Sequence, residues 1–158
     1  ELAERQWRCT IAGSLDRDAA TADALRATID RLGLSERITL TGALDPTPLD
    51  SVYRSADIFV LPSRYEGYGM VFTEAMARGL PIVACAAGAV PTTVPREAGL
   101  LVPPDDAAAL AEALRRLLDD PAERRERGEA AIDHARALPS WNDTARRVAE
   151  AIQKASEA

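Results

Sequence analysis

The chain has 158 residues, which is close to the commonest size for one compact domain and long enough to bury a hydrophobic core. It carries 19 Lys and Arg residues against 25 Asp and Glu residues, a formal net charge of −6, with a pI of about 4.9. This acidic balance argues against binding to a phosphate backbone, so no nucleic-acid partner is expected. No apolar run approaches the ~20 residues that a membrane helix needs, and no signal-type start is visible. We therefore expect a soluble, cytoplasmic protein.

Residue usage adds two expectations. Alanine is abundant and Lys154 is the only lysine, a bias typical of a GC-rich bacterial genome. Cys9 and Cys85 each lie in a short apolar run, without CxxC spacing and without a nearby histidine. They are predicted to be core cysteines, and no metal-ligand cluster is visible in the sequence.

Strand-like apolar runs alternate with helix-like periodicity over the first two thirds of the chain. The expected strands are 7–13, 37–42, 57–62, 81–86 and 99–104. The expected helices between them run over about 18–32, over a short stretch that carries Leu49, Val52 and Tyr53, and onward from Tyr68 or Gly69. The run 57–62 is apolar enough to be a central parallel strand that is covered on both faces.

The last third of the chain is predicted to be helical. Asp105 or Asp106 can cap a helix whose apolar face carries Leu110, Leu114, Leu117 and Leu118, and Pro121 suits the first turn of the next helix. Ser140 precedes a final helix over about 141–155. A strand–helix alternation followed by consecutive helices predicts an α/β fold, a Rossmann-like doubly wound parallel sheet with helices on both faces. The opening "ELAER" looks like the end of a helix, so we expect one domain over 1–158 that is a fragment.

One stretch, "RYEGYGMVFTEAMARGLPIV" at 64–83, combines a glycine-rich turn with two glutamates, Glu66 and Glu74. The turn follows a strand end and leads into a helix, which is where doubly wound sheets bind ligands. Gly67 and Gly69 let backbone N–H groups approach a ligand closely, and the helix start favours an anion such as a diphosphate. At 100° per residue, Val71, Phe72, Ala75, Met76 and Gly79 share one helix face, and Met70, Glu74 and Ala77 lie on the other. Glu74 is therefore predicted to point away from the core.

Ionised carboxylates are acceptors only, so in a neutral ligand they recognise pairs of hydroxyls, such as a ribose diol. Two carboxylates that flank an anion site indicate a nucleotide sugar. A plainer alternative stays open, in which Glu74 and Arg78 form an ordinary helix ion pair and Glu66 is a solvated loop residue.

The segment "PSRYEGYGMVFTEAMARGLPIVA" resembles the motif of two glutamates with seven residues between them in the group 1 family of retaining glycosyltransferases. The similarity extends through "GLLVPPDDAAALAEALRRLLDDP" and back through "ITLTGAL" and "YRSADIFVLPS", in the order and spacing of the family. It implies the C-terminal, donor-binding half of a two-domain GT-B enzyme. An N-terminal acceptor domain, and the first strand and helix of this half, would then lie outside the chain. Any membrane association would come only through that absent half.

The resemblance also implies roles for individual residues. Glu66 would be the catalytic residue, contacting hydroxyls of the transferred sugar, and Glu74 would bind the ribose diol. Backbone groups of Gly67, Tyr68, Gly69 and Met70 would hold sugar and diphosphate, and the main chain of Leu44 would meet the base. The implied reaction is transfer of a sugar, expected to be a hexose, from a nucleotide diphosphate sugar to an acceptor hydroxyl in bacterial polysaccharide biosynthesis. No metal or other cofactor is expected, and the isolated chain is expected to be inactive.

The chain departs from the family pattern in two places. An Arg and a Lys that neutralise the diphosphate have no counterpart before "ELAER", and Arg64 reads as an exposed loop residue. Where the family shows two glycines followed by an acidic residue, this chain has Gly88, Ala89, Thr92 and Thr93. Two further hypotheses stay open: a non-catalytic nucleotide or nucleotide-sugar binding module, and a flavodoxin-like domain. Against the flavodoxin-like hypothesis, a signalling domain of that fold needs an acidic cluster at its strand ends, and the strands "TIAG" and "FVLP" of this chain end without one.

Overall fold

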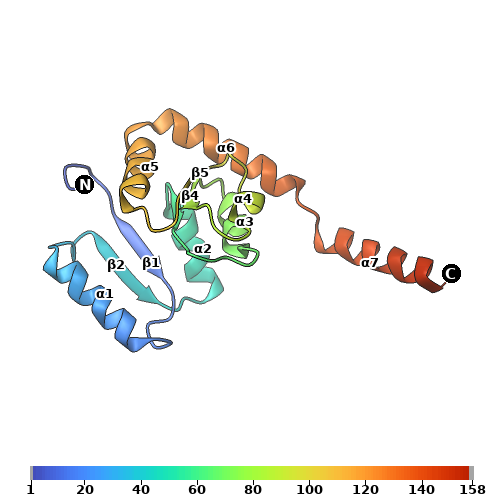
Figure 1. Ribbon diagram of the computed structural model, residues 1–158, viewed down its shortest axis with the longest axis horizontal. Coiled ribbons are helices and arrows are strands. Elements are labelled where there is room, and N and C mark those ends of the chain that lie inside the picture. The colour runs from blue at the N-terminus through green and yellow to red at the C-terminus, as the bar shows by residue number, and fades with distance from the viewer. Residues whose placement is uncertain (1, 157–158) are drawn as a thin grey trace.

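The computed structural model describes residues 2–156 and has an α/β architecture (Figure 1). In chain order the elements are β1 (Cys9–Ala12), α1 (Ala19–Arg31), β2 (Ile38–Gly42), α2 (Pro46–Ser55), β3 (Phe59–Leu61), α3 (Met70–Met76), β4 (Ile82–Cys85), α4 (Val90–Thr93), β5 (Gly99–Val102), α5 (Ala107–Asp119), α6 (Pro121–Ala137) and α7 (Trp141–Ser156). The alternation of strands and helices and the three consecutive helices at the end confirm the predicted fold class. Only the short helix α4 was not predicted.

The strands form two parallel sheets, β1-β2 and β3-β4-β5. Register pairs Cys9 with Ile38 in the first sheet, and Ile82 with both Phe59 and Gly99 in the second. All strands are parallel to their neighbours, so within each sheet the carboxyl ends lie at one edge. Among the described strands, β1 and β3 do not pair with each other.

The run 57–62 was predicted to be a central strand, and this is wrong for the described sheets. β3 pairs only with β4 and is an edge strand, with Val60 38% exposed. The central strand is β4, which is buried along its whole length because core clusters cover both of its faces. One cluster contains Phe72, Met76 and Ile82, and the other contains Val83 and Leu117.

Aspartate side chains begin three of the helices. Asp18 accepts a hydrogen bond from the Thr21 amide, Asp106 from the Ala109 amide, and Asp120 from the amides of Ala122 and Glu123. Each carboxylate satisfies N–H groups that the first helical turn leaves without a partner. Of the two candidates for α5, Asp106 is therefore the cap.

The aspartates that directly precede two of these caps, Asp105 and Asp119, form ion pairs with arginines. Asp105 adopts a positive φ of 61° and pairs with Arg64, the Nε atom lying 2.7 Å from Oδ1. Asp119 pairs with Arg5 at 2.6 Å and so links the N-terminal segment to α5. These two carboxylates form ion pairs instead of caps.

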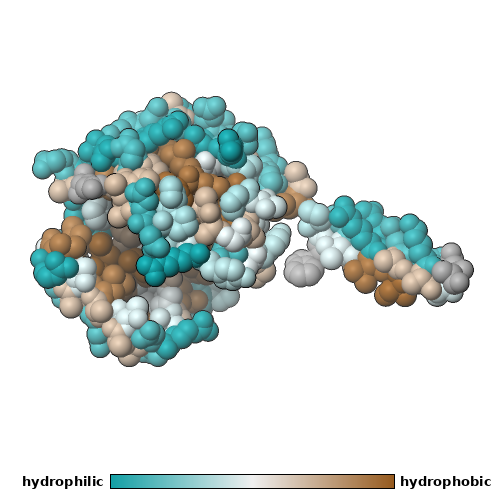
Figure 2. All heavy atoms as spheres, in the orientation of Figure 1, coloured by the Kyte–Doolittle hydropathy of each residue, from teal (hydrophilic) through white to brown (hydrophobic). Residues whose placement is uncertain are grey.

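Helix α7 extends away from the rest of the molecule (Figure 1). Apolar side chains gather along one of its faces (Figure 2), and Val148 and Ile152 are 54% and 65% exposed. Within residues 2–156, no helix combines the length and the apolar character needed to cross a membrane.

Candidate functional site

The glycine-rich loop that contains Glu66 connects β3 to α3 and therefore lies at the carboxyl edge of its parallel sheet. Glu66 is half-buried, whereas Tyr65 and Tyr68 are 81% and 60% exposed. Helix α3 begins at Met70, next to the predicted start. Its inner face carries Phe72, Ala75 and Met76, all fully buried, while Met70 is 62% exposed. The predicted orientation of α3 is confirmed, and Glu74 lies half-buried on its outer side.

Gly69 fixes the approach of the loop to the helix. It has a left-handed backbone, with φ at 76°, that favours glycine. A Cβ atom there would lie 2.5 Å from Cδ2 of Phe72 and 3.1 Å from Cγ of Glu66. The Glu66 side chain therefore lies directly beside the turn, opposite the ring that anchors α3 in the core. Only glycine meets both requirements at this position.

The backbone amides of the loop are available to a ligand. Among the described residues, none accepts a hydrogen bond from the N–H groups of Gly67, Tyr68, Gly69 or Met70. The first N–H groups of a helix have no partner inside that helix, and no side chain caps α3. Four successive donors of this kind beside a carboxylate can hold an anionic group and a hydroxyl-bearing group together.

Glu74 is held by a tyrosine from the preceding helix. The Tyr53 hydroxyl on α2 donates to Oε2 of Glu74 across 3.2 Å, and the Tyr53 ring is buried and stacked against Phe59. Burial, together with the nearby Glu74 carboxylate, raises the pKa of Tyr53 to about 12. The phenol therefore remains a donor at neutral pH. Because one carboxylate oxygen is engaged by Tyr53, Tyr53 positions Glu74 while the other oxygen can accept from a ligand.

The alternative that Glu74 and Arg78 form an ion pair is wrong. Arg78 pairs through its guanidinium with Asp50 on α2 at 2.7 Å and lies over the Tyr53 ring. Its only bond to Glu74 goes to the backbone carbonyl oxygen, at 2.8 Å. Arg78 therefore fastens α3 to α2, and the Glu74 side chain is not committed to it.

The structure brings Glu66, Gly67, Tyr68, Gly69 and Met70 together in one loop, with Glu74 one turn further along α3. Leu44 lies far from this loop in the sequence. It is half-buried in the connection between β2 and α2, and β2 belongs to the other sheet. In the described chain no hydrogen bond joins it to residues 66–74. Its predicted contact with a base stays a prediction.

Positive charge is scarce around this loop. Arg64 is exposed, as predicted, and its guanidinium is paired with Asp105, while that of Arg78 is paired with Asp50. A hollow of about 300 Å³ beside Pro62, Arg64 and Cys85 lies at the carboxyl ends of the strands. The described residues contain no group of three or more His, Cys, Asp or Glu placed to hold a metal ion. Cys85 is buried as predicted, whereas Cys9 is only half-buried.

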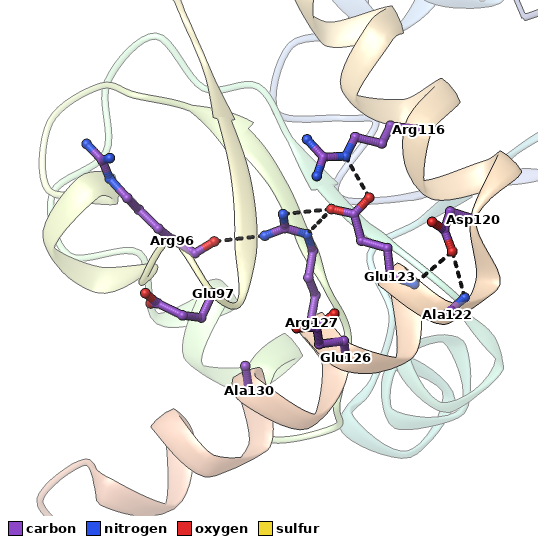
Figure 3. A pocket seen from close by; sticks show the side chains of 9 residues that line it. All are labelled: Arg96, Glu97, Arg116, Asp120, Ala122, Glu123, Glu126, Arg127 and Ala130. Atoms are coloured by element: carbon purple, nitrogen blue, oxygen red, sulfur yellow. Dashed lines mark hydrogen bonds and ion pairs between the residues drawn. The ribbon is translucent and has the colours of Figure 1, made fainter.

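A larger cavity, of about 680 Å³, lies between the corner of α5 and α6 and the segment around Arg96 (Figure 3). Glu123 lines this cavity and accepts hydrogen bonds from Arg116 and from Arg127. Arg127 also donates to the carbonyl oxygens of Arg96 and Gly99. Burial alone would raise the pKa of Glu123, but the two arginine hydrogen bonds hold it below its usual value. These contacts fasten α6 to the sheet, so the cavity is structural and is not the candidate site.

Sequence reasoning missed two sets of contacts at the site. Tyr53 was predicted only as a face residue of a short helix. A buried tyrosine usually finds a hydrogen-bond partner for its hydroxyl, and that is the signal that could have found it. The segment from Gly88 to Thr93 was noted only as a departure from a pattern, although it packs directly on the glycine-rich loop.

The fold and the loop define an α/β protein with a candidate ligand site at the carboxyl edge of a parallel sheet. Residues 1–120 match the protein family described as "Glycosyl transferases group 1". The chain belongs to this family, in agreement with the resemblance seen in the sequence.

Relatives among characterised sequences include the D-inositol 3-phosphate glycosyltransferases of Corynebacterium glutamicum and Corynebacterium efficiens. The first is 41% identical over 143 residues, which is 90% of this chain and 34% of the relative. The second is 38% identical over 156 residues, which is 98% of this chain and 37% of the relative. The chain thus spans about a third of the length of these relatives.

Solved structures give the same fold. Sucrose-phosphate synthase from Thermosynechococcus elongatus superposes with a TM-score of 0.83 at 36% identity, covering 94% of this chain and 38% of that one. Anabaena HepE, solved in complex with UDP, superposes with a TM-score of 0.87 at 24% identity, covering 97% of this chain and 43% of that one. The C-terminal domain of a group 1 glycosyl transferase from Francisella tularensis superposes with a TM-score of 0.70 at 24% identity, covering 82% of this chain and 84% of that one. The last comparison places the likeness in a C-terminal domain.

Proposed function

We propose that this chain is the donor-binding half of a retaining glycosyltransferase, which moves a sugar, most simply a hexose, from a nucleotide diphosphate sugar to an acceptor hydroxyl. The observation that carries the proposal is the loop over 66–70. It offers four unpartnered amides to a diphosphate beside the half-buried Glu66 carboxylate. Membership of the group 1 family supports the same reading.

Each end of the donor has a matching group in this arrangement. The amides of Gly67 to Met70 receive the diphosphate and part of the sugar, and Glu66 accepts from the sugar hydroxyls. Its negative charge also stabilises positive charge that develops on the sugar ring, an electrostatic role without a covalent bond to the protein. Glu74, held by Tyr53, accepts from the ribose diol. The main chain around Leu44 meets the base.

The sheet order supports a further strand in the same domain. The common strand order of dinucleotide-binding sheets is 3-2-1-4-5-6. If one strand precedes β1 in the chain, β1 to β5 become strands two to six of that series. The pair β2-β1 then corresponds to 3-2, and β3-β4-β5 corresponds to 4-5-6. The first strand then belongs between β1 and β3, where Ile11 and Val60 are 37% and 38% exposed. A strand there would join both sheets into one.

The remaining parts of the reaction are assigned outside the chain. The relatives are about three times as long, which supports an N-terminal half that holds the acceptor and supplies positive charge to the diphosphate. The donor's own diphosphate oxygen helps to deprotonate the acceptor hydroxyl in this proposal, so that no protein nucleophile is required from this half. A cytoplasmic location and a part in bacterial polysaccharide biosynthesis remain predictions from the sequence.

Binding can be measured directly by calorimetry. We expect the chain to bind at least one of UDP, GDP and ADP weakly, and to distinguish the matching sugar conjugate from the free nucleotide. Binding should be weak because the arginines next to the loop are already paired with carboxylates. Each ligand is titrated with and without its sugar, and inorganic sulfate serves as the control for a plain anion. The absence of heat for every nucleotide at millimolar concentration would contradict the proposed function.

A further inference from the structure

The glycine-rich loop has little support of its own. Residues 62–69 form no regular secondary structure between the end of β3 and the start of α3. Tyr65, Tyr68 and Met70 are largely exposed, so their side chains do not anchor it in the core. A loop built this way needs an external contact to hold a carboxylate and four amides in one arrangement.

That contact comes from the segment that follows β4. The carbonyl oxygen of Glu66 accepts a hydrogen bond from the Ala89 amide at 3.0 Å. The carbonyl oxygen of Tyr68 accepts one from the Thr93 hydroxyl at 2.9 Å. The two acceptors lie on either side of Gly67. Turning both carbonyls toward this segment fixes the planes of the two peptides that carry the Gly67 and Gly69 N–H groups, which point the opposite way in a trans peptide.

Gly88 makes the close approach possible. Its backbone has a φ of 56°, and a Cβ atom there would overlap the carbonyl oxygen of Glu66 and lie 3.0 Å from the Glu66 nitrogen. No residue with a side chain fits against Glu66 at this distance without moving the loop.

The supporting segment is itself rigidly held. Helix α4 begins at Val90 and is followed directly by Val94, and these two residues are 0% and 1% exposed and belong to the core cluster that also contains Ile82 of β4. Thr93 is only 9% exposed, so its hydroxyl must find acceptors within the protein, and it has two, the carbonyl oxygens of Tyr68 and Ala89. The core thus sets the position of the hydroxyl that holds the loop.

We propose that Thr93 and Gly88 are positioning residues for donor recognition: they hold the carbonyls of Tyr68 and Glu66 so that the loop amides and the Glu66 carboxylate face the donor. This inference rests on the proposed function and adds residues to it that touch no donor atom. It gives a role to the segment from Gly88 to Thr93, where the chain departs from the family pattern.

Two substitutions of Thr93 test the contribution of its hydroxyl and that of its methyl group one at a time. Thr93→Val keeps the shape and removes the donor, whereas Thr93→Ser keeps the donor and removes a buried methyl group. The probe is whichever of UDP, GDP and ADP binds the wild-type chain most tightly by calorimetry. We expect Thr93→Val to weaken its binding roughly tenfold and Thr93→Ser to stay within about twofold, since one hydrogen bond is at stake. Thr93→Ser should nevertheless have the lower melting temperature of the two, because it loses buried packing.

A glycine pair gives a second, independent comparison. Gly88→Ala and Gly33→Ala both place a side chain at positive φ, but a Cβ at Gly33 meets nothing within 4 Å. Both variants should melt at lower temperature than the wild type, and only Gly88→Ala should lose binding, by more than about tenfold if the loop must shift.

The outcomes distinguish this inference from the proposed function. Nucleotide binding by the wild type that survives unchanged in Thr93→Val, or that falls equally in Thr93→Val and Thr93→Ser, would overturn the positioning role and leave the donor site standing. Equal binding by Gly88→Ala and Gly33→Ala would overturn it as well. A wild type that binds none of the three nucleotides would remove the donor site itself.

Discussion

Glu74→Ala is expected to weaken nucleotide binding by about 1.5 to 3 kcal/mol, the range for hydrogen bonds to a charged group, while the melting temperature stays nearly unchanged. Binding falls because the ribose diol loses its acceptor. Stability is largely spared because the Arg78 guanidinium bonds to Asp50 and to the backbone carbonyl of residue 74, which the substitution retains, although the part-buried Tyr53 hydroxyl loses its acceptor. Calorimetry with the best-binding nucleotide, together with a thermal melt, measures both quantities.

Two matched variants sharpen this expectation. Asp50→Ala removes the partner of Arg54 and Arg78 and should lower the melting temperature slightly, because ion pairs that solvent reaches contribute little to stability, while nucleotide binding stays unchanged. Tyr53→Phe should weaken binding in the wild-type background but not in Glu74→Ala, because Tyr53 acts through Glu74. Additive losses from Tyr53→Phe and Glu74→Ala would contradict that connection, and unchanged binding in Glu74→Ala would remove Glu74 from the site.

Glu66→Gln is expected to have the largest effect on activity, a loss of roughly 10²–10³ in turnover, the size seen when one preorganised electrostatic contact to a transition state is removed. The substitution keeps the shape and the packing beside Gly69 but removes the negative charge that, in the proposed function, stabilises the sugar ring. The measurement uses a protein in which the proposed N-terminal half precedes this chain, a labelled nucleotide sugar, and a panel of acceptors. D-inositol 3-phosphate belongs in that panel because it is named in the relatives.

The present chain provides the comparison for this experiment. It should transfer no sugar, because an acceptor hydroxyl must be held about 3 to 3.5 Å from the reacting carbon and the donor half holds only one side of that arrangement. Slow hydrolysis of the donor is the most that we expect from it. Full activity of the longer Glu66→Gln protein would remove the role assigned to Glu66, and acceptor-dependent turnover by the short chain would contradict the two-domain proposal.

The sequence predicted those features that depend on local patterns. The start of α3 next to Gly69 follows from the glycine-rich turn, and the burial of Phe72 and Met76 follows from helical periodicity. Asp106 caps α5 where an aspartate before an apolar face indicated a helix start, and α6 begins at Pro121, which suits a first helical turn. These signals lie within a few residues of one another and need no knowledge of the rest of the fold.

What the sequence did not predict depends on distant contacts. The apolar run around β3 reads as a central strand, but its place in the sheet depends on which strands lie beside it. The bond between Tyr53 and Glu74 joins residues 21 positions apart, and that between Thr93 and Tyr68 joins residues 25 apart. Arg78 has both Asp50 and Glu74 within reach, and only the packing of α2 against α3 decides between them.

The central claim is that the loop over 66–70 and Glu74 bind a nucleotide diphosphate donor, and a crystal structure of the chain with its best-binding nucleoside diphosphate tests it most directly. The proposed function predicts diphosphate oxygens within about 3.2 Å of the amides of Gly67 to Met70, with the ribose hydroxyls on the Glu74 carboxylate. A nucleotide bound elsewhere, for example in the cavity beside Glu123, with the loop amides facing only solvent, would contradict it.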